Sequence, residues 1–183
     1  MRKLLFSVLA FLLVLGACTS PQSSQLKIDY TQLVNPFIGT DFTGNTYPGA
    51  QAPFGMVQLS PDNGLGGWDR ISGYFYPDST IAGFSHTHLS GTGAGDLYDV
   101  LFMPVTLPYK EAKGELGIHS KFSHQDEEAS AGYYRVKLQD YNINVELTAT
   151  PRCGVQRYTF PKAESMVILN LKKAMNCFHH SQQ

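Results

Sequence analysis

The segment G-Y-Y-R-V-K-L-Q-D-Y-N-I-N-V-E-L-T-A, residues 132–149, decides the fold. Apolar side chains occupy alternate positions on both sides of the short polar stretch at residues 140–142. Because successive side chains of a β-strand point to opposite faces, this alternation places one face on a core and the other in water. The polar stretch can turn one strand into the next, so the segment predicts an antiparallel hairpin.

Similar β-rich runs surround this hairpin, at residues 56–60, 73–76, 81–86, 100–105, 118–123, 154–160 and 165–171. Prolines in the first half exclude a long helix. Several such strands in series predict an all-β fold, an antiparallel β-sandwich. Residues 28–33 are expected to be short helical or irregular, and residues 124–131 to be a solvated loop.

Length and composition are typical of one globular domain. The chain has 183 residues, a formal net charge of −1, 43% hydrophobic residues and 16% charged residues. This is enough chain to bury a core, and the near-neutral charge gives no electrostatic reason to expect a nucleic acid as partner. No P-loop, dinucleotide fingerprint or nucleophile elbow is present. Cys153 and Cys177 do not make a disulfide framework, and we expect Cys153 to be buried in a strand.

The N-terminus has the pattern of an export signal. Arg2 and Lys3 precede an apolar run at residues 4–15, which is too short to span a bilayer as a helix. The run L-G-A-C at residues 15–18 resembles a bacterial lipobox, which predicts a lipoprotein signal peptide over residues 1–17 and lipidation of Cys18. An ordinary signal peptide is the alternative.

The polar residues 18–27 predict a flexible tether between the lipid and the domain. Acyl chains on Cys18 would anchor a soluble domain to a membrane. We therefore expect an exported bacterial lipoprotein, in the periplasm or at the outer membrane.

Residues 67–99 carry the chemistry. This stretch holds the single tryptophan, two histidines and six glycines. In Trp68-Asp69-Arg70, the indole face can stack on the apolar face of a pyranose, while the two charged side chains can bridge neighbouring hydroxyls. These residues predict one wall of a sugar-binding site. The alternative is a tryptophan that anchors the loop to the core, with Asp69 and Arg70 paired at the surface.

His86-Thr87-His88 is the second candidate. Residues two apart on a strand point to the same side, so both imidazoles could meet one ligand, with His88 the better candidate for a projecting side chain. Three interpretations stay open: hydrogen bonding to a sugar, a metal with Asp96 or Asp99 as oxygen ligand, or structural packing. The run G-T-G-A-G-D at residues 91–96 lacks the lysine and the following helix that a phosphate-binding loop needs.

The carboxylates of this half do not identify a catalytic pair. The candidates are Asp62, Asp69, Asp78, Asp96 and Asp99. An inverting glycosidase needs an acid and a base roughly 6.5–9.5 Å apart, and no residue here has a sequence context that singles it out as the acid. The sequence predicts a binding wall without an evident acid/base pair.

Five ordered motifs resemble the N-terminal domain of glycoside hydrolase family 92 exo-α-mannosidases. They are V-N-P-F-I-G-T (34–40), Y-P-G-A-Q-A-P-F-G-M-V-Q-L-S-P-D (47–62), S-G-Y (72–74), G-F-S-H-T-H-L-S-G-T-G (83–93) and D-V-L-F-M-P (99–104). The resemblance covers residues 34–171. It implies a supersandwich-like β-sandwich that precedes an (α/α)6-barrel catalytic domain, in calcium-dependent, inverting enzymes that remove terminal α-mannose, often α-1,2-linked, from N-glycans.

The resemblance also implies where the chemistry lies. The acid, the base and most of the calcium site belong to the barrel, so no catalytic or metal-binding residue is predicted in this chain. Trp68, Asp69 and Arg70 would lie at the mannose pocket, with His86 and His88 at or near it. The ligand is then a mannose-containing glycan.

The end of the chain departs from the family. Family members continue for several hundred residues beyond the position of Gln183, and residues 173–183 read as an aberrant or disordered tail in which His179-His180 is a weak metal candidate. We expect a sandwich domain at residues 28–172 from a truncated or frameshifted gene. Its partner is the missing (α/α)6 domain, and the fragment alone is expected to be inactive. The alternatives are a free-standing carbohydrate-binding β-sandwich module and a remnant that does not fold.

Overall fold

The computed structural model describes residues 28–91, 97–109, 111 and 117–171. The predicted signal peptide, the lipidation site Cys18, the tether and the tail lie outside the described residues, as do Asp96 and Cys177. Within the described ranges, no helix has the length and apolar character needed to cross a membrane.

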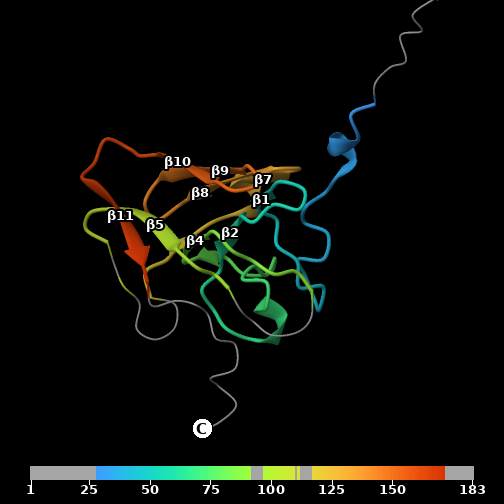
Figure 1. The fold of residues 1–183 in the computed structure, drawn as a ribbon. Helices are drawn as coiled ribbons and strands as arrows, with labels where there is room; N and C mark the ends of the chain where they lie inside the picture. Colours follow the sequence, from blue (N-terminus) through green and yellow to red (C-terminus); the bar gives the residue numbers. More distant parts are fainter. Residues whose placement is uncertain (1–27, 92–96, 110, 112–116, 172–183) are drawn as a thin grey trace, which may run out of the picture.

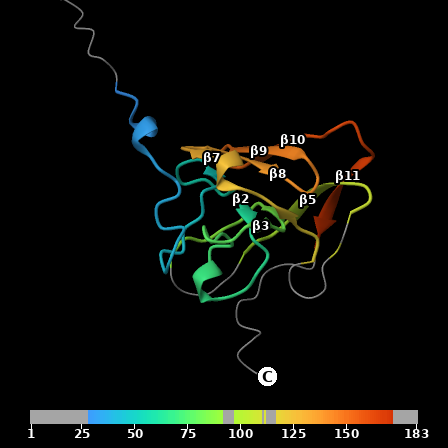
Figure 2. The same cartoon turned by 180° about the vertical axis from the view of Figure 1, so that it is seen from behind.

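Two antiparallel sheets pack face to face, which confirms the predicted all-β sandwich (Figures 1 and 2). The first sheet has the order β1-β2-β4-β5-β11 and the second the order β10-β9-β8-β7. The strands of the first sheet are β1 (Ala50–Gln51), β2 (Gln58–Asp62), β4 (Gly83–Ser85), β5 (Leu101–Thr106) and β11 (Ser165–Asn170). Those of the second are β7 (Glu127–Ser130), β8 (Tyr133–Leu138), β9 (Ile143–Ala149) and β10 (Gly154–Thr159).

Shorter elements complete the architecture. A two-stranded sheet pairs β3 (Thr80–Ile81) with β6 (Ser120–Lys121). Single turns of 3-10 helix form η2 (Tyr30–Leu33), η3 (Trp68–Arg70) and η4 (His124–Asp126). The short helical character expected near residues 28–33 is confirmed by η2.

The β8–β9 hairpin follows the alternation in the sequence. Its register runs from Tyr133 opposite Thr148 to Leu138 opposite Ile143, and Asn142 in the turn has the left-handed φ of 52° that a tight connection uses. The inward side chains of both strands are at most 2% exposed: Tyr134, Val136, Leu138, Ile143, Val145 and Leu147. Burial of each large apolar side chain contributes about 1.5–3 kcal/mol. These two strands supply six of the fifteen side chains of the core cluster among the described residues.

Two sequence predictions about local structure are wrong. Residues 73–76 do not form a strand, because Gly73 has a φ of 86° and Tyr74 leaves the extended path to bury its ring in the core. Residues 124–131 are not a simple solvated loop. They form η4 and β7, because Glu127 turns inward and the segment pairs with β8.

Cys153 also differs from expectation. It lies in the turn before β10 and is exposed, so it is not a buried strand residue. Its thiol is free among the described residues. The turn places it after Thr150, whose hydroxyl accepts a hydrogen bond from the backbone N–H of Cys153 (3.0 Å).

Candidate functional site

The η3 turn lies in a loop that is closed at its base. The backbone N–H of Asn63 donates to the carbonyl oxygen of Gly73 (2.8 Å). The buried Asn63 side chain accepts from the N–H of Phe75 (2.5 Å) and donates to the carbonyl of Thr80 (2.7 Å). These bonds fix the base of the loop while Trp68 within it stays 56% exposed. The indole is therefore available to a ligand, and the interpretation of Trp68 as a core anchor is not supported.

Arg70 is held by a partner that the sequence did not single out. Its Nε and Nη2 make a bidentate ion pair with Asp78, at 2.7 and 2.5 Å. The guanidinium also lies over the ring of Phe75, 4.8 Å from its centroid. The hydrogen bonds that Arg70 donates to the Asp78 carboxylate raise the pKa of Arg70. The expected alternative, a surface pair between Arg70 and Asp69, is therefore not the pairing that forms.

His88 is buried, so the expectation that it projects is wrong. Only 3% of the residue is exposed, and Nδ1 donates to the carbonyl oxygen of Gln58 (2.7 Å). Nε2 lies 2.9 Å from Oδ1 of Asp62 and 3.2 Å from Oγ of Ser85. A nucleophilic triad needs the carboxylate and the hydroxyl on opposite ring nitrogens. Since both meet Nε2 here, the cluster does not have the arrangement of a nucleophilic triad.

His86 has different surroundings. Its Nδ1 contacts the carbonyl oxygen of Val100 (3.1 Å), and its ring meets Phe102 edge to face at 5.5 Å. β4 ends at Ser85, so the alternation expected of a strand does not apply to the two histidines. In the described part of the chain, no hydrogen bond or ring contact joins either histidine to the η3 turn. Their predicted role in sugar binding stays a prediction.

The described residues do not fit a metal centre. They contain no group of three or more His, Cys, Asp and Glu side chains that could hold an ion. Both nitrogens of His88 are engaged, and Oδ2 of Asp99 accepts from the hydroxyl of Thr87 (3.2 Å). The metal interpretation of the His86–His88 pair is therefore not supported by the residues present, and Asp96 lies outside them.

Three loops meet around η3, and we call residues 40–47, 63–76 and 87–91 the loop face. Hydrogen bonds join them: Gly91 N–H to Asn45 O (2.7 Å), Ser72 Oγ–H to Thr46 O (2.9 Å) and Tyr76 N–H to Thr40 O (2.8 Å). Each loop presents a large exposed side chain, Phe42 at 80%, Trp68 at 56% and Leu89 at 49%. Asp41 lies beside Phe42, and Asp69 and Arg70 follow Trp68, so the loop face combines exposed apolar side chains with charged groups, a mixture that suits a sugar surface.

A buried carboxylate supports the loop face from below. Glu127, whose side chain is 1% exposed, accepts from the phenols of Tyr74 (3.0 Å) and Tyr134 (2.6 Å). His124 Nδ1 lies 2.6 Å from the same carboxylate, while its Nε2–H donates to the carbonyl oxygen of Tyr76 (2.8 Å). Burial raises the pKa of the two phenols. This network has no local sign in the sequence, because Glu127 stands in a polar run that is typical of a solvated loop.

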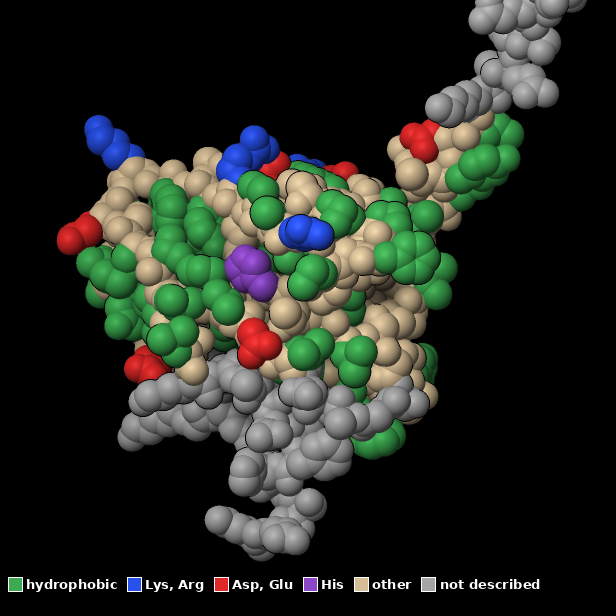
Figure 3. All heavy atoms as spheres, viewed as in Figure 1, with side chains coloured by type: hydrophobic (Ala, Val, Ile, Leu, Met, Phe, Trp, Pro, Cys, Tyr) green, Lys and Arg blue, Asp and Glu red, His purple; other side chains and the backbone are tan. Residues whose placement is uncertain are grey.

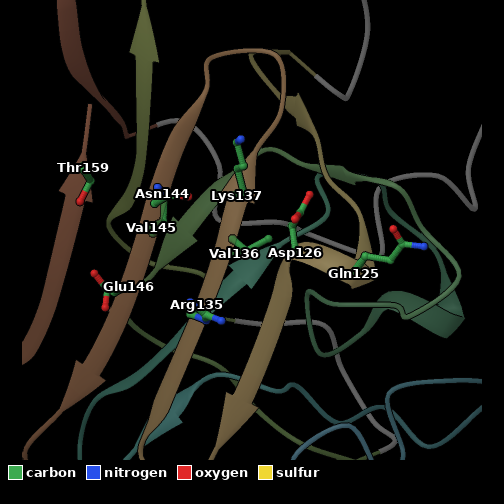
Figure 4. A pocket seen from close by; sticks show the side chains of 9 residues that line it. All are labelled: Gln125, Asp126, Arg135, Val136, Lys137, Asn144, Val145, Glu146 and Thr159. Carbon is green, nitrogen blue, oxygen red and sulfur yellow. The ribbon is translucent and has the colours of Figure 1, made fainter. Parts of the chain in front are cut away.

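Two hollows are not lined by residues of η3. A polar one of about 290 Å³ lies on the outer face of β8 and β9, where Figure 4 shows the side chains of Arg135 and Glu146. The second, of about 650 Å³, is lined by Tyr47, whose ring packs against His88 at 5.0 Å and whose pKa burial raises to about 12. Neither hollow is lined by a residue that the sequence predicted to bind sugar.

Comparison with known proteins gives consistent results. Residues 33–182 match the model of the glycosyl hydrolase family 92 N-terminal domain. The structure is similar to that of the family GH92 α-mannosidase BT3965 from Bacteroides thetaiotaomicron, solved also in complex with mannoimidazole, with 45% identity, a TM-score of 0.74, and coverage of 79% of this chain and 20% of that one. The inverting mannosidase BT2199 from the same organism is 31% identical, with a TM-score of 0.64, over 78% of this chain and 20% of that one.

A curated relative is an uncharacterized secreted glycosidase of Arthroderma benhamiae, 29% identical over 82% of this chain and 20% of its own length. The chain thus spans about a fifth of the length of the relatives that it matches. The family match covers most of the chain, and the similar structures share its fold. The chain belongs to the family of glycosyl hydrolase family 92 N-terminal domains.

Proposed function

We propose that this chain forms the sugar-facing wall of an α-mannosidase, and that Trp68 is its stacking surface. The observation that carries the proposal is an exposed indole on a loop whose base is closed by the buried Asn63. An aromatic face fixed in this way can stack on a pyranose without first losing conformational freedom. A mannosidase 45% identical to this chain has been solved with mannoimidazole, which supports mannose as the sugar.

The chemistry of hydrolysis would come from outside this chain. Three of its carboxylates are engaged in internal pairs: Asp62 with His88, Asp78 with Arg70, and Glu127 with His124. Calcium dependence, inversion and action on terminal α-mannose of N-glycans are therefore proposed as properties of a complete enzyme. The isolated chain is proposed to be inactive, because the resemblance to family 92 places the acid and the base in a separate barrel domain. The secreted relative supports export, and lipid anchoring through Cys18 remains part of the proposal.

A free-standing carbohydrate-binding module is the second candidate. It is favoured by one observation: the contacts that hold η3, from Asn63 and Asp78, all lie within this chain. The wall therefore does not depend on a second domain for its shape.

Titration with mannose by NMR tests both candidates. We expect resonances of the loop face to shift, and the shifts to be lost in Trp68→Ala. Tyr30→Ala is the matched control, because Tyr30 is 69% exposed in η2, outside the loop face. Shifts that survive in Trp68→Ala would contradict the wall. Hydrolysis of an aryl α-mannoside by the isolated chain with calcium, abolished by a substitution within it, would contradict the proposed inactivity.

A further inference from the structure

The larger of the two hollows, of about 650 Å³, has a lining without charge, and we call it the neutral pocket. One wall is the arm at residues 31–36, which Figure 3 shows projecting from the body of the molecule at the upper right. Another wall is the turn between β7 and β8. The volume lies in the range of roughly 300–1,000 Å³ that is usual for pockets that bind small molecules.

The lining of the neutral pocket mixes apolar groups with groups that form hydrogen bonds. The apolar side chains are those of Val34, Pro36, Ala52, Pro53, Ala131 and Ala149. The hydrogen-bonding side chains are those of Thr31, Tyr47, Gln51, Ser90, Ser130 and Thr148. A pyranose presents the same mixture, because its ring carries both apolar C–H faces and hydroxyl groups.

Gln51 presents an oriented hydrogen-bond donor. The hydroxyl of Tyr47 donates to Oε1 of Gln51 (2.6 Å), so the amide nitrogen of Gln51 faces away from Tyr47. Within the described ranges, that nitrogen has no hydrogen-bond partner. Tyr47 is itself held in place, because its ring packs against the buried His88 at 5.0 Å. A ligand oxygen can therefore accept from a donor that is already positioned.

The absence of charge restricts the class of ligand. Phosphates, carboxylates and metal ions are held mainly by charged or imidazole side chains, and none of the described residues that line the pocket is Asp, Glu, Lys, Arg or His. A wholly apolar ligand is disfavoured as well, because it would leave the amide nitrogen of Gln51 without water or another partner. A neutral ligand with hydroxyl groups meets both conditions.

We propose that the neutral pocket binds a second sugar residue of the glycan whose terminal mannose meets Trp68. The choice of a sugar rests on the proposed function. The pocket adjoins the loop face, because Tyr47 and Ser90 belong to both. The two parts are also joined by the backbone N–H of Gly91, which donates to the carbonyl oxygen of Asn45 (2.7 Å). Together they form a surface for a glycan longer than a monosaccharide.

NMR titration of the full chain, labelled with carbon-13 in its alanine methyl groups, tests this assignment. The probes are methyl α-mannoside and a linear α-linked mannotriose. We expect mannotriose to bind about tenfold more tightly, because it gains contacts in the pocket. Mannotriose should shift the methyl signals of Ala52, Ala131 and Ala149, while the signal of Ala163, which lines neither hollow, should not move.

A variant of Gln51 tests the donor. Gln51→Leu removes the amide at similar side-chain size, so it should lower the affinity for mannotriose about tenfold and leave the affinity for methyl α-mannoside unchanged. Gln139→Leu is the matched control, because Gln139 is an exposed glutamine in the β8–β9 turn that lines neither hollow. It should bind both probes as the unsubstituted protein does.

The outcomes separate this proposal from the proposed function. Loop-face shifts with unchanged signals from the three pocket alanines, or a tenfold gain for mannotriose that Gln51→Leu retains, would overturn the pocket assignment alone. Alanine shifts without loop-face shifts would overturn the sugar wall and leave the pocket standing. If mannotriose shifts neither set of signals, both are overturned.

Discussion

Glu127 offers the sharpest test of how this sandwich is held together. Its carboxylate accepts hydrogen bonds from Tyr74 and Tyr134 and contacts His124, and the side chain is 1% exposed. Glu127→Ala removes the one acceptor that these groups share. Both phenols are completely buried, so water cannot replace the lost partner without disturbing the core.

The magnitude follows from the groups left behind. Glu127→Ala leaves two buried phenols without their acceptor, and each unsatisfied buried polar group costs about 1–3 kcal/mol. We expect Glu127→Ala to lower the free energy of unfolding by about 4 kcal/mol. Glu127→Gln keeps one oxygen acceptor and the side-chain volume, so the loss should be about half as large, roughly 2 kcal/mol.

Urea denaturation followed by circular dichroism measures these changes. The matched control is Glu128→Ala, one residue further along β7, where the side chain is 54% exposed and pairs with the exposed Arg135. An exposed pair contributes at most about 1 kcal/mol. If Glu127→Ala and Glu128→Ala destabilise the protein by the same amount, the network does not contribute to stability as argued here.

Three further outcomes are expected. Gly73→Ala should lower the free energy of unfolding by about 3 kcal/mol, because φ is +86° and the new Cβ would lie 2.4 Å from Oδ1 of Asp62. Gly132→Ala is the control in the same urea assay. Its φ is +78° but the nearest atom to the new Cβ lies 3.9 Å away, so the loss should be about 1 kcal/mol. Burial raises the folded-state pKa of Tyr47 to about 12, above its ordinary value of 10, so the stability that its neutral phenol contributes is complete below pH 10 and is lost as pH rises toward 12. The difference between the urea midpoints at pH 9 and pH 11.5 should therefore be smaller in Tyr47→Phe than in the unsubstituted protein. Asp78→Ala should weaken mannose binding about tenfold, because it releases Arg70 from its fixed position. If NMR titration gives the variant and the unsubstituted protein the same affinity for mannose, Asp78 does not position Arg70 for binding.

The sequence predicted those parts of the fold whose cause is local. β8 and β9 alternate apolar and polar residues, and their register follows directly from that pattern. β7 was missed because its two glutamates suggested solvent. The residue that makes one of them an inward side chain, Tyr74, lies 53 positions away in the chain. No local pattern can report a partner at that distance.

The candidate site divides in the same way. The exposure of Trp68 could be anticipated from the flanking glycines, which favour an exposed loop. The burial of His88 could not, because it depends on Asp62, 26 residues earlier. The sequence also missed Asp78 as the partner of Arg70, since a carboxylate eight residues away is not a regular neighbour in a loop without helical or strand periodicity.

The end of β2 connects the histidine segment and the tryptophan loop to the same part of the core. Asp62 is the last residue of β2 and contacts His88, while Asn63, the next residue, bonds to Phe75 and Thr80 at the base of the Trp68 loop. Both side chains are at least 98% buried, so both segments are attached to the core of the sandwich. A displacement of β2 would move both together. The shape of the proposed sugar wall is therefore set by the packing of the two sheets, and a second domain would need to supply chemistry but not the shape of this wall.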